Sequence, residues 1–517
     1  MRRIKLKALL AFSMLLSSAA AAERRVKLEP ARDTGLKQII EKWKADELQR
    51  QGSTPNPTWW LWGLVGFDYD NDGDVDLLAH GHGAPLSIVI RNQLKETGQL
   101  TFVNANPELG LAVNGLSGCS KPLAWDFDGD GFIDLAFCDV QKSTCFFNKA
   151  GRKFEPMAYA FGQREHLKSV GDVNDDGIPD VYHDQAQFLY DARRRTFNRR
   201  QINRRDVMHP LHAAPPEALL SVIDEQKKSD FTPRYLHYYE GIDLNADGRA
   251  DLGCGYFASY GGARWGRYLL AEDTGHLTDA TERLGLPKDG APILFHDFND
   301  DGADDVLVAG AGMYLSRPEG GFALKPGPVT DFLNYRYLYS PVAIRVDFAN
   351  TGRPDLVIHN GRNEVAKIFE NRTGGEFHEL VSQRTWTDAV VACDINNDGL
   401  IDVAIAGPED SITVYLNETK NPGTGCFIHP RIARPNPYAV GATIDVYRAG
   451  ALKNPGAKPL FSEQAHPEGT PIHFGLGDET TLDLRVTFPG KTPKVVEFQN
   501  VTARPHLGVT AEGLSEE

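Results

Sequence analysis

The chain has 517 residues, of which 41% are hydrophobic, with 50 glycines, 31 prolines and 5 methionines. This length fits several domains or one large repeat array, and so much glycine and proline favours many turns and short strands over long helices. The formal net charge of -15 argues against nucleic acid as a partner, because phosphate groups would be repelled.

Residues 1–22 are typical of a secretory signal peptide. Four basic residues lie within the first seven, ALLAFSMLL forms a short apolar stretch, and Ala20 and Ala22 provide a small-residue cleavage site. The apolar stretch is too short for a stable membrane span, which disfavours the alternative of a retained anchor. We expect an exported protein that is periplasmic, secreted or on the cell surface, with no membrane span after cleavage. Cleavage would take the formal charge from -15 to -19.

The next segment, residues 23–56, contains one predicted helix. Residues 34–49 (TGLKQIIEKWKADELQ) place Leu36, Ile39, Ile40 and Trp43 near helical spacing. We expect a short helix that packs on the following domain. Binding of a membrane or a partner by this helix is the alternative.

From residue 68 onwards the chain repeats the nonamer D-x-D/N-x-D-G-x-x-D. Six copies are intact, and a seventh, DFANTGRPD at Asp347, is degenerate. In chain order the copies start 58, 46, 71, 54, 50 and 47 residues apart. Internal repetition at this spacing indicates one supersecondary unit per copy.

The spacing within each nonamer predicts a calcium loop. Calcium takes about six to eight oxygen ligands, and positions one, three, five and nine supply carboxylate or amide oxygens while a glycine at six permits a sharp turn. The absence of His and Cys from the pattern favours calcium over zinc or copper. The loop is not an EF-hand, because position twelve is never Glu. The alternative is that these runs only form turns.

We therefore expect about six structural Ca²⁺ sites, one in each intact copy. Their predicted ligands are Asp68, Asp70, Asp72 and Asp76; Asp126, Asp128, Asp130 and Asp134; Asp172, Asn174, Asp176 and Asp180; Asp243, Asn245, Asp247 and Asp251; Asp297, Asn299, Asp301 and Asp305; and Asp394, Asn396, Asp398 and Asp402. The seventh copy has Ala349 and Thr351 at positions three and five, so no metal is expected there.

Strand-like segments surround each loop. Apolar runs precede and follow the nonamers, so each loop is predicted to be the turn of a β-hairpin. A third apolar segment follows, such as SIVIRN, TCFFN, AKIFEN or ITVYLN, and then an aromatic residue. About four strands per roughly 50 residues predict an all-β, seven-bladed β-propeller, because such units must stack to bury their faces. An open β-solenoid is the alternative.

These repeats resemble the FG-GAP/VCBS repeats of integrin α-subunit propellers over residues 57–422. The resemblance implies that each loop joins the first two strands of a blade and binds calcium. Residues 423–517 carry GATIDVYRAG, HFGLGD and LRVTFPGKT, which resemble the ASPIC/UnbV domain of cartilage-acidic-protein-like sequences. The W-P-S-G typical of that domain is Phe488-Pro489-Gly490 here. Alternation of short strands and turns predicts a small β domain in any case, with His473 as a turn or core residue.

Six cysteines would enter an oxidising compartment after export. They are Cys119, Cys138, Cys145, Cys254, Cys393 and Cys426. Cys138 and Cys145 flank a short turn and are candidates for a disulfide across a hairpin. Buried free thiols are the alternative, and the sequence does not decide between the two.

Candidate ligand-binding residues gather in the loops expected on the face opposite the calcium loops. They are Trp59, Trp60, His80, His82, Arg264 and Arg362. Aromatic, histidine and arginine side chains suit a glycan or protein partner. Each also has a plainer interpretation: core packing for the tryptophans, and polar or charged loop positions for the others.

The predicted function is therefore binding or adhesion through an unidentified protein or glycan partner. No catalytic residue is assigned, because no G-x-S-x-G, H-E-x-x-H or P-loop motif is present. The alternative is a polysaccharide lyase or hydrolase with its site on the face opposite the calcium loops. A purely structural matrix protein is a third possibility.

Overall fold

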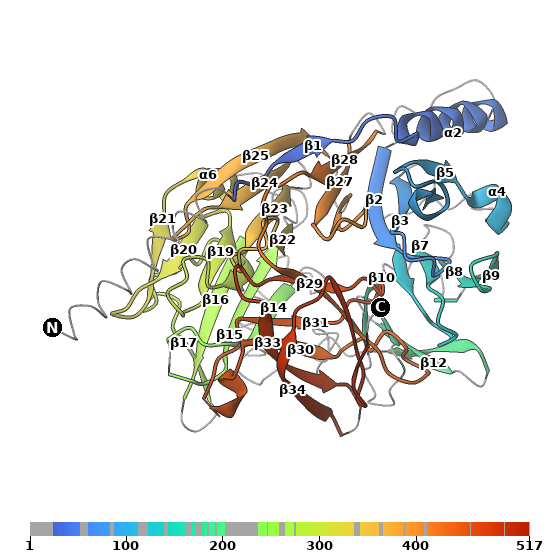
Figure 1. Cartoon of the computed structure of the whole chain (residues 1–517). Coiled ribbons are helices and arrows are strands. Elements are labelled where there is room, and N and C mark those ends of the chain that lie inside the picture. Colours follow the sequence, from blue (N-terminus) through green and yellow to red (C-terminus); the bar gives the residue numbers. More distant parts are fainter. Residues whose placement is uncertain are drawn as a thin grey trace.

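The computed structural model describes most of the chain. It omits residues 1–23, 52–59, 83–86, 112–121, 139–142, 159, 162–166, 172–177, 179, 184–185, 192–193, 202–235, 246, 258–263, 273–275, 335–341, 361–364, 386–388, 408–410, 455, 491 and 516–517. The fold is all-β with about 8% helix, as predicted, and it is consistent with a β-propeller. Figure 1 shows the sheets of the first four-fifths of the chain placed around a common centre, with the C-terminal strands lying across it.

Seven four-stranded antiparallel sheets follow one another in the described part of the chain, and neighbouring strands in six of them are consecutive in sequence. The first three contain β2 (Trp60–Phe67), β3 (Asp76–His82), β4 (Ser87–Asn92) and β5 (Phe102–Asn104); β6 (Leu123–Trp125), β7 (Asp134–Cys138), β8 (Ser143–Asn148) and β9 (Phe154–Ala158); and β10 (Leu167–Gly171), β11 (Asp180–His183), β12 (Ala186–Asp191) and β13 (Thr196–Gln201).

The next four sheets repeat this arrangement. They contain β14 (Leu236–Ile242), β15 (Asp251–Phe257), β16 (Arg264–Ala271) and β17 (Leu277–Asp279); β18 (Ala291–His296), β19 (Asp305–Ala309), β20 (Gly312–Ser316) and β21 (Phe322–Lys325); β22 (Val342–Val346), β23 (Asp355–Asn360), β24 (Val365–Asn371) and β25 (Phe377–Arg384); and β26 (Val390–Cys393), β27 (Asp402–Ala406) and β28 (Ile412–Asn417) with β1 (Leu28–Pro30).

The seventh sheet takes its outer strand from the other end of the chain. β1 pairs antiparallel with β28, with Leu28 opposite Asn417 and Pro30 opposite Tyr415. Pro30 is tolerated because β1 is an edge strand. The segment 23–56 was expected to contribute only a helix, and this strand was missed. The pairing ties the start of the chain to its last sheet and covers an otherwise open edge.

The helices in the described part of the chain are α2 (Leu36–Gln51), α3 (Leu94–Thr97), α4 (Asn106–Leu109), α6 (Pro328–Leu333) and the 3₁₀ turn η2 (Ala451–Lys453). The predicted helix is confirmed as α2. Leu36 and Ile40 are each 2% exposed and pack with strands of the first and last sheets. The described helices include none that is long and apolar enough to span a membrane.

The second strand of each sheet is the most buried. Every residue of β19 (DVLVA) and β27 (DVAIA) is buried. Strands that read as continuous apolar runs are packed on both faces, so neighbouring sheets must cover both sides of these strands. Cores such as the one shared by Leu61, Leu77, Ala404 and Val414 join the first sheet to the last.

In each of four sheets, a buried asparagine at the end of the third strand forms a hydrogen bond to the preceding sheet. The side-chain Nδ2 of Asn148 donates to Tyr69 O at 2.7 Å, and that of Asn92 donates to Ile395 O at 3.0 Å. The other two bonds run from Asn371 to Phe298 O and from Asn417 to Phe348 O. We call Asn92, Asn148, Asn371 and Asn417 the inter-sheet asparagines. The bond of Asn92 joins the first sheet directly to the seventh.

Residues 425–515 form a separate domain, the C-terminal domain, with its own core. Its strands are β29 (Gly425–Pro430), β30 (Thr443–Arg448), β31 (Phe461–Gln464), β32 (Ile472–Gly475), β33 (Thr481–Phe488), β34 (Lys494–Thr502), β35 (His506–Val509) and β36 (Leu514–Ser515). They form two four-stranded sheets, one with the order β32-β29-β35-β36 and the other β31-β30-β33-β34. This agrees with the small β domain expected from the alternating pattern.

Four of the cysteines are free thiols rather than members of a disulfide. Cys145, Cys254, Cys393 and Cys426 are buried free thiols. The disulfide considered between Cys138 and Cys145 is not formed, because the register places Ala136, not Cys138, opposite Cys145. Cys119 lies outside the described residues.

Candidate metal centres on the repeated loops

Each described loop joins the first two strands of its sheet, as the sequence predicts. In the loop that starts at Asp68, β2 ends at Phe67 and β3 begins at Asp76. We name each loop by its first residue. The glycine at position six has a positive φ of 81–93° in the Asp68, Asp126, Asp243, Asp297, Asp347 and Asp394 loops. This conformation is open to glycine at no steric cost, which explains its place in the pattern.

The aspartate at position one shapes the loop through its own backbone. In the Asp126 loop, Asp126 Oδ1 accepts from the N–H of Asp130 at 3.0 Å, and Oδ2 accepts from Gly131 at 2.7 Å. The same two bonds occur in the Asp68, Asp243, Asp297, Asp347 and Asp394 loops. Both oxygens of the position-one aspartate therefore accept backbone N–H groups of their own loop.

The aspartate at position nine ties the loop to the third strand. Asp134 is fully buried, and its two oxygens accept from the backbone N–H of Phe127 at 2.8 Å and of Asn148 at 2.6 Å. Asp355, in the degenerate loop, makes the same bonds to Phe348 at 3.0 Å and Asn371 at 2.7 Å. Position nine therefore has a structural role even where no metal is expected.

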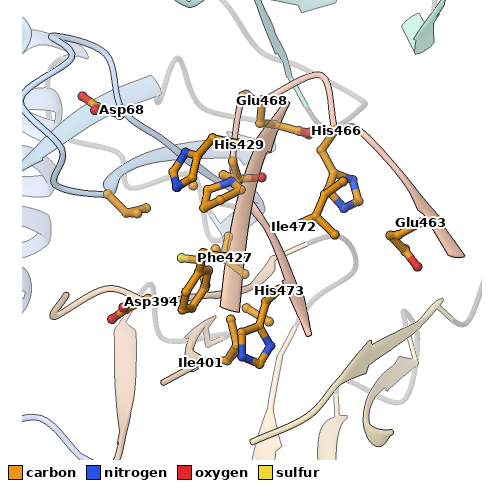
Figure 2. Close-up of a pocket in the computed structure, with 18 of the residues that line it drawn as sticks. Asp68, Asp394, Ile401, Phe427, His429, Glu463, His466, Glu468, Ile472 and His473 are labelled. Carbon is orange, nitrogen blue, oxygen red and sulfur yellow. The ribbon is translucent and has the colours of Figure 1, made fainter. Parts of the chain in front are cut away.

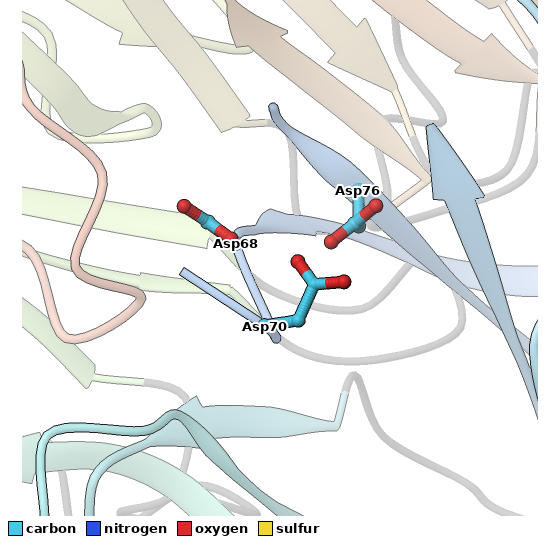
Figure 3. A group of neighbouring side chains, drawn as sticks. All are labelled: Asp68, Asp70 and Asp76. Carbon is cyan, nitrogen blue, oxygen red and sulfur yellow. The ribbon is translucent and has the colours of Figure 1, made fainter. Parts of the chain in front are cut away.

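Two loops bring three carboxylates together. Asp68, Asp70 and Asp76 place one oxygen each within 4.8 Å of one another, and so do Asp126, Asp128 and Asp134. Figure 3 shows the first group gathered at the turn between β2 and β3. These are the two loops with aspartate rather than asparagine at position three. The predicted ligands at positions one, three and nine are thus assembled there.

These carboxylates are held away from water. Burial raises the pKa of Asp68 to about 7, and the neighbouring Asp72 and Asp70 add to the rise. Burial likewise raises the pKa of Asp126 to about 7 and that of Asp70 to about 6. Burial also raises the pKa values of Asp76 and Asp134 well above the usual range of an aspartate. Without a cation, ionising these groups near neutral pH is costly, and a bound cation would reverse that effect.

Two oxygens at position three are left for a ligand. Asp70 Oδ1 and Asp128 Oδ1 are buried and have no hydrogen-bond partner among the residues that the structure describes. The Asp128 side chain is only 10% exposed, and its other oxygen pairs with Lys149 at 3.2 Å and Arg195 at 2.5 Å. A buried carboxylate oxygen without a donor is rare unless an ion or water completes it. Both loops fit a hard, oxygen-binding cation such as Ca²⁺.

The loops with asparagine at position three are less acidic. Asn245, Asn299 and Asn396 each donate from Nδ2 to the position-five aspartate, at 2.8, 2.9 and 2.9 Å. In the Asp243 loop, Arg249 also pairs with Asp247 and lowers the pKa of that carboxyl. Burial raises the pKa of Asp305 to about 7 and that of Asp402 to about 8. The described loops are therefore not equivalent.

The remaining predicted ligands are placed as follows. Asp172, Asn174 and Asp176 lie outside the described residues, whereas Asp180 is buried and accepts from Tyr190 N at 3.0 Å. Sequence reasoning missed Asp74, at position seven, which groups with Asp72 and Glu96. It also missed the inter-sheet asparagines, although an Asn ends each of the four third-strand motifs quoted for those sheets.

The degenerate Asp347 loop contacts the C-terminal domain. Asn350 Oδ1 accepts from His473 Nε2 at 2.8 Å, and Asn350 O accepts from Gly477 N at 2.9 Å. A Cβ at Gly475 would overlap Asp347 Oδ2, so the two backbones meet closely. Desolvation lowers the pKa of His473 to about 3, so its ring is a neutral donor. The loop that lost metal ligands provides a domain interface.

A cavity of about 1220 Å³ lies where this domain covers the centre of the sheets. Its walls include Asp68 and Asp394 from the loops and Phe427, His429 and His473 from the C-terminal domain (Figure 2). His429 Nε2 lies 3.0 Å from His506 Nδ1, and the Phe427 ring stacks on His506 at 5.2 Å. Polar, aromatic and apolar groups converge here, on the face that carries the repeated loops.

The residues predicted for the opposite face are mostly not described. Trp59 and Arg362 lie outside the described residues, and the side chains of Trp60, His82 and Arg264 are not described either. His80 is 1% exposed, and its Nδ1 lies 2.7 Å from Ser87 Oγ. It is therefore a buried strand residue rather than a surface loop residue.

The comparison with protein families identifies the repeat. Residues 347–405 match the family model described as FG-GAP-like repeat. The chain carries an FG-GAP-like repeat. The match runs from the Asp347 loop through the Asp394 loop to β27, so it contains one degenerate and one intact nonamer. No curated protein matches the chain by sequence.

Solved structures resemble the chain only distantly. A lectin from Agrocybe aegerita is 18% identical, with 63% of this chain and 81% of that chain covered, at a TM-score of 0.35. The extracellular domain of BT4673 from B. thetaiotaomicron is 8% identical, covering 92% and 58%, also at 0.35. The V. cholerae biofilm matrix protein Bap1 is 10% identical, covering 79% and 94%, at 0.34. Likenesses at this level carry no functional argument.

Proposed function

We propose that the chain is an exported, calcium-binding β-propeller that acts as a binding or adhesion module for a protein or glycan partner. In this account the seven four-stranded sheets are the blades of one ring, and residues 1–22 are a cleaved signal peptide. The C-terminal domain is proposed to be of the ASPIC/UnbV type, on the motifs quoted above. The FG-GAP-like repeat at residues 347–405 supports this account.

The observation that carries the proposal is the pair of three-carboxylate clusters in the Asp68 and Asp126 loops. Asp70 Oδ1 and Asp128 Oδ1 are buried and lack hydrogen-bond partners within the described structure. Calcium would supply the positive charge that these buried groups need. Extracellular modules bind it at about 10⁻⁴–10⁻³ M, so each site would add about 1–3 kcal/mol to stability.

The partner would bind a surface whose loops are stabilised by calcium. The cavity under the C-terminal domain combines aromatic, histidine and acidic groups. Such a mixture suits hydroxyl-rich or peptide ligands, which offer donors, acceptors and apolar faces together. We therefore propose that the partner binds on the face that carries the repeated loops, rather than on the opposite face expected from the loop sequences.

The test is calcium-dependent capture of a defined ligand. Full-length mature protein would be applied to a glycan array and to a panel of purified surface proteins, in calcium and in EDTA. We expect at least one ligand to be retained in calcium and released in EDTA. Chemical conversion of a retained polysaccharide would instead favour the enzyme alternative. A folded, calcium-loaded protein that binds neither class would contradict the proposal.

A further inference from the structure

Three loops are joined side to side by hydrogen bonds from position four. Asn397, in the Asp394 loop, donates from Nδ2 to Gly73 O at 3.2 Å and to Asp74 Oδ1 at 2.8 Å, both in the Asp68 loop. Asn71, in the Asp68 loop, donates from Nδ2 to Gly131 O at 2.8 Å in the Asp126 loop. The Asp394, Asp68 and Asp126 loops therefore form one connected row, which we call the loop row.

The donors of these bonds depend on the loop conformation. Asn71 and Asn397 have φ values of 58° and 56°, in the left-handed region. Each lies between the ligand positions three and five of its own loop. The acceptors Gly73 O and Gly131 O belong to the position-six glycines, whose N–H groups bind the position-one aspartates. A change in one loop's ligand geometry is thus transmitted to atoms that shape the next loop.

The same neighbours are tied again beneath the loops. Asn92 donates to Ile395 O, and Asn148 donates to Tyr69 O. Ile395 and Tyr69 are at position two of the Asp394 and Asp68 loops, between the first two ligands. Each junction in the loop row therefore has at least one bond from position four and one buried bond from an inter-sheet asparagine.

The row ends on the C-terminal domain. Gly129 takes position four in the Asp126 loop, and a Cβ there would meet Pro435 O at 2.7 Å. Tyr438 Oη donates to Gly131 O at 3.0 Å, and Arg434 donates to Asp130 O. Residues 434–438 thus contact the loop at the positions that calcium ligation would fix.

We propose that the loop row binds calcium cooperatively and that its occupancy controls docking of the C-terminal domain through residues 434–438. This inference rests on the calcium binding proposed above. Calcium binding to one loop orders the hydrogen-bond partners of the next loop. The next ion therefore binds with a smaller loss of conformational entropy. The Asp297 loop has Asp300 rather than asparagine at position four, so it shares the buried bond, from Asn371 to Phe298 O, but has no amide donor at this position, and it serves as an internal reference.

The test uses glycine substitutions, because glycine tolerates the positive φ and removes only the amide. Calcium would be titrated calorimetrically into metal-stripped, full-length mature protein. We expect Asn71→Gly and Asn397→Gly to make calcium binding less cooperative and to weaken the calcium affinity of the cooperative phase by about 5-fold or more. The number of bound ions should not change. The control is Asp300→Gly, also at position four with φ 62°, in the Asp297 loop, compared with Asp300→Asn so that loss of the carboxylate charge is measured separately.

Docking would be followed by the rate of tryptic cleavage after Arg431, which lies over the Tyr438 ring at 4.8 Å. In the parent protein, calcium should slow this cleavage, and Asn71→Gly should require more calcium for the same protection. If the parent and Asn71→Gly gave equal calcium-binding isotherms, or if Asp300→Gly lost as much affinity and cooperativity as Asn71→Gly, the proposed coupling between loops would be wrong. The proposal that the loops bind calcium would still stand. No calcium uptake by the parent protein would overturn both proposals.

Discussion

Replacing Asp134 with alanine is expected to lower the free energy of unfolding by about 2–6 kcal/mol in EDTA. The substitution removes the acceptors of two buried backbone N–H groups, those of Phe127 and Asn148. Each orphaned group costs about 1–3 kcal/mol, and the third strand of the sheet loses its link to the loop. In calcium the loss should be larger, because a metal ligand is removed as well. Urea unfolding in EDTA measures the loss from the orphaned backbone N–H groups. The same experiment in calcium measures the additional loss from the missing metal ligand.

Two variants separate these roles. Asp355→Ala removes the same pair of backbone bonds from the degenerate loop, so its loss should be equal in calcium and in EDTA. Asp70→Asn keeps the volume and removes a proposed ligand, so it should lower stability in calcium but be neutral or stabilising in EDTA. If Asp70→Asn and Asp355→Ala responded to calcium alike, the division between a position-three ligand and a position-nine structural residue would be wrong.

Asn92→Ala is expected to destabilise the protein by about 2–5 kcal/mol. Asn92 is fully buried, and its Nδ2 donates to Ile395 O at 3.0 Å and to Val75 O at 3.3 Å. The alanine leaves both carbonyl oxygens without this donor and opens a small cavity. Because the bond joins the first sheet to the seventh, the junction between the two ends of the repeat array should loosen first. Hydrogen exchange of β2 and β26 would report this loosening.

The matched control is Asn371→Ala, which removes the equivalent bond to Phe298 O between two internal sheets. We expect a similar loss of stability, with faster exchange in β18 and β22 instead. Exchange that rises uniformly across the molecule in both variants would contradict a local role for these bonds. No loss of stability in either variant would show that the inter-sheet asparagines are dispensable.

The sequence predicts the local units well because their signals are local. A nonamer such as DYDNDGDVD contains its own turn glycine, its predicted metal ligands and the first residue of the next strand, so the hairpin follows from nine residues. The helix at residues 36–51 also has its apolar spacing within one segment. In both cases the information and the structure lie in the same short stretch.

Contacts between distant segments are harder to read. β1 has three residues, and its partner β28 lies almost 400 positions away, so no local pattern marks the pairing. The Asp347 loop is similar: the loss of ligands at Ala349 and Thr351 is visible, but its contact with His473 depends on where a second domain docks. The role of Asn92 likewise needs the position of the neighbouring sheet.

Structural calcium in the repeated loops can be tested by the metal content of the mature protein, measured by mass spectrometry and paired with melting curves in calcium and in EDTA. We expect about six calcium ions per chain, one for each intact nonamer. We also expect a fall in melting temperature of roughly 10 °C or more on chelation. A protein that holds no calcium and melts at the same temperature in both buffers would show that these aspartates only form turns.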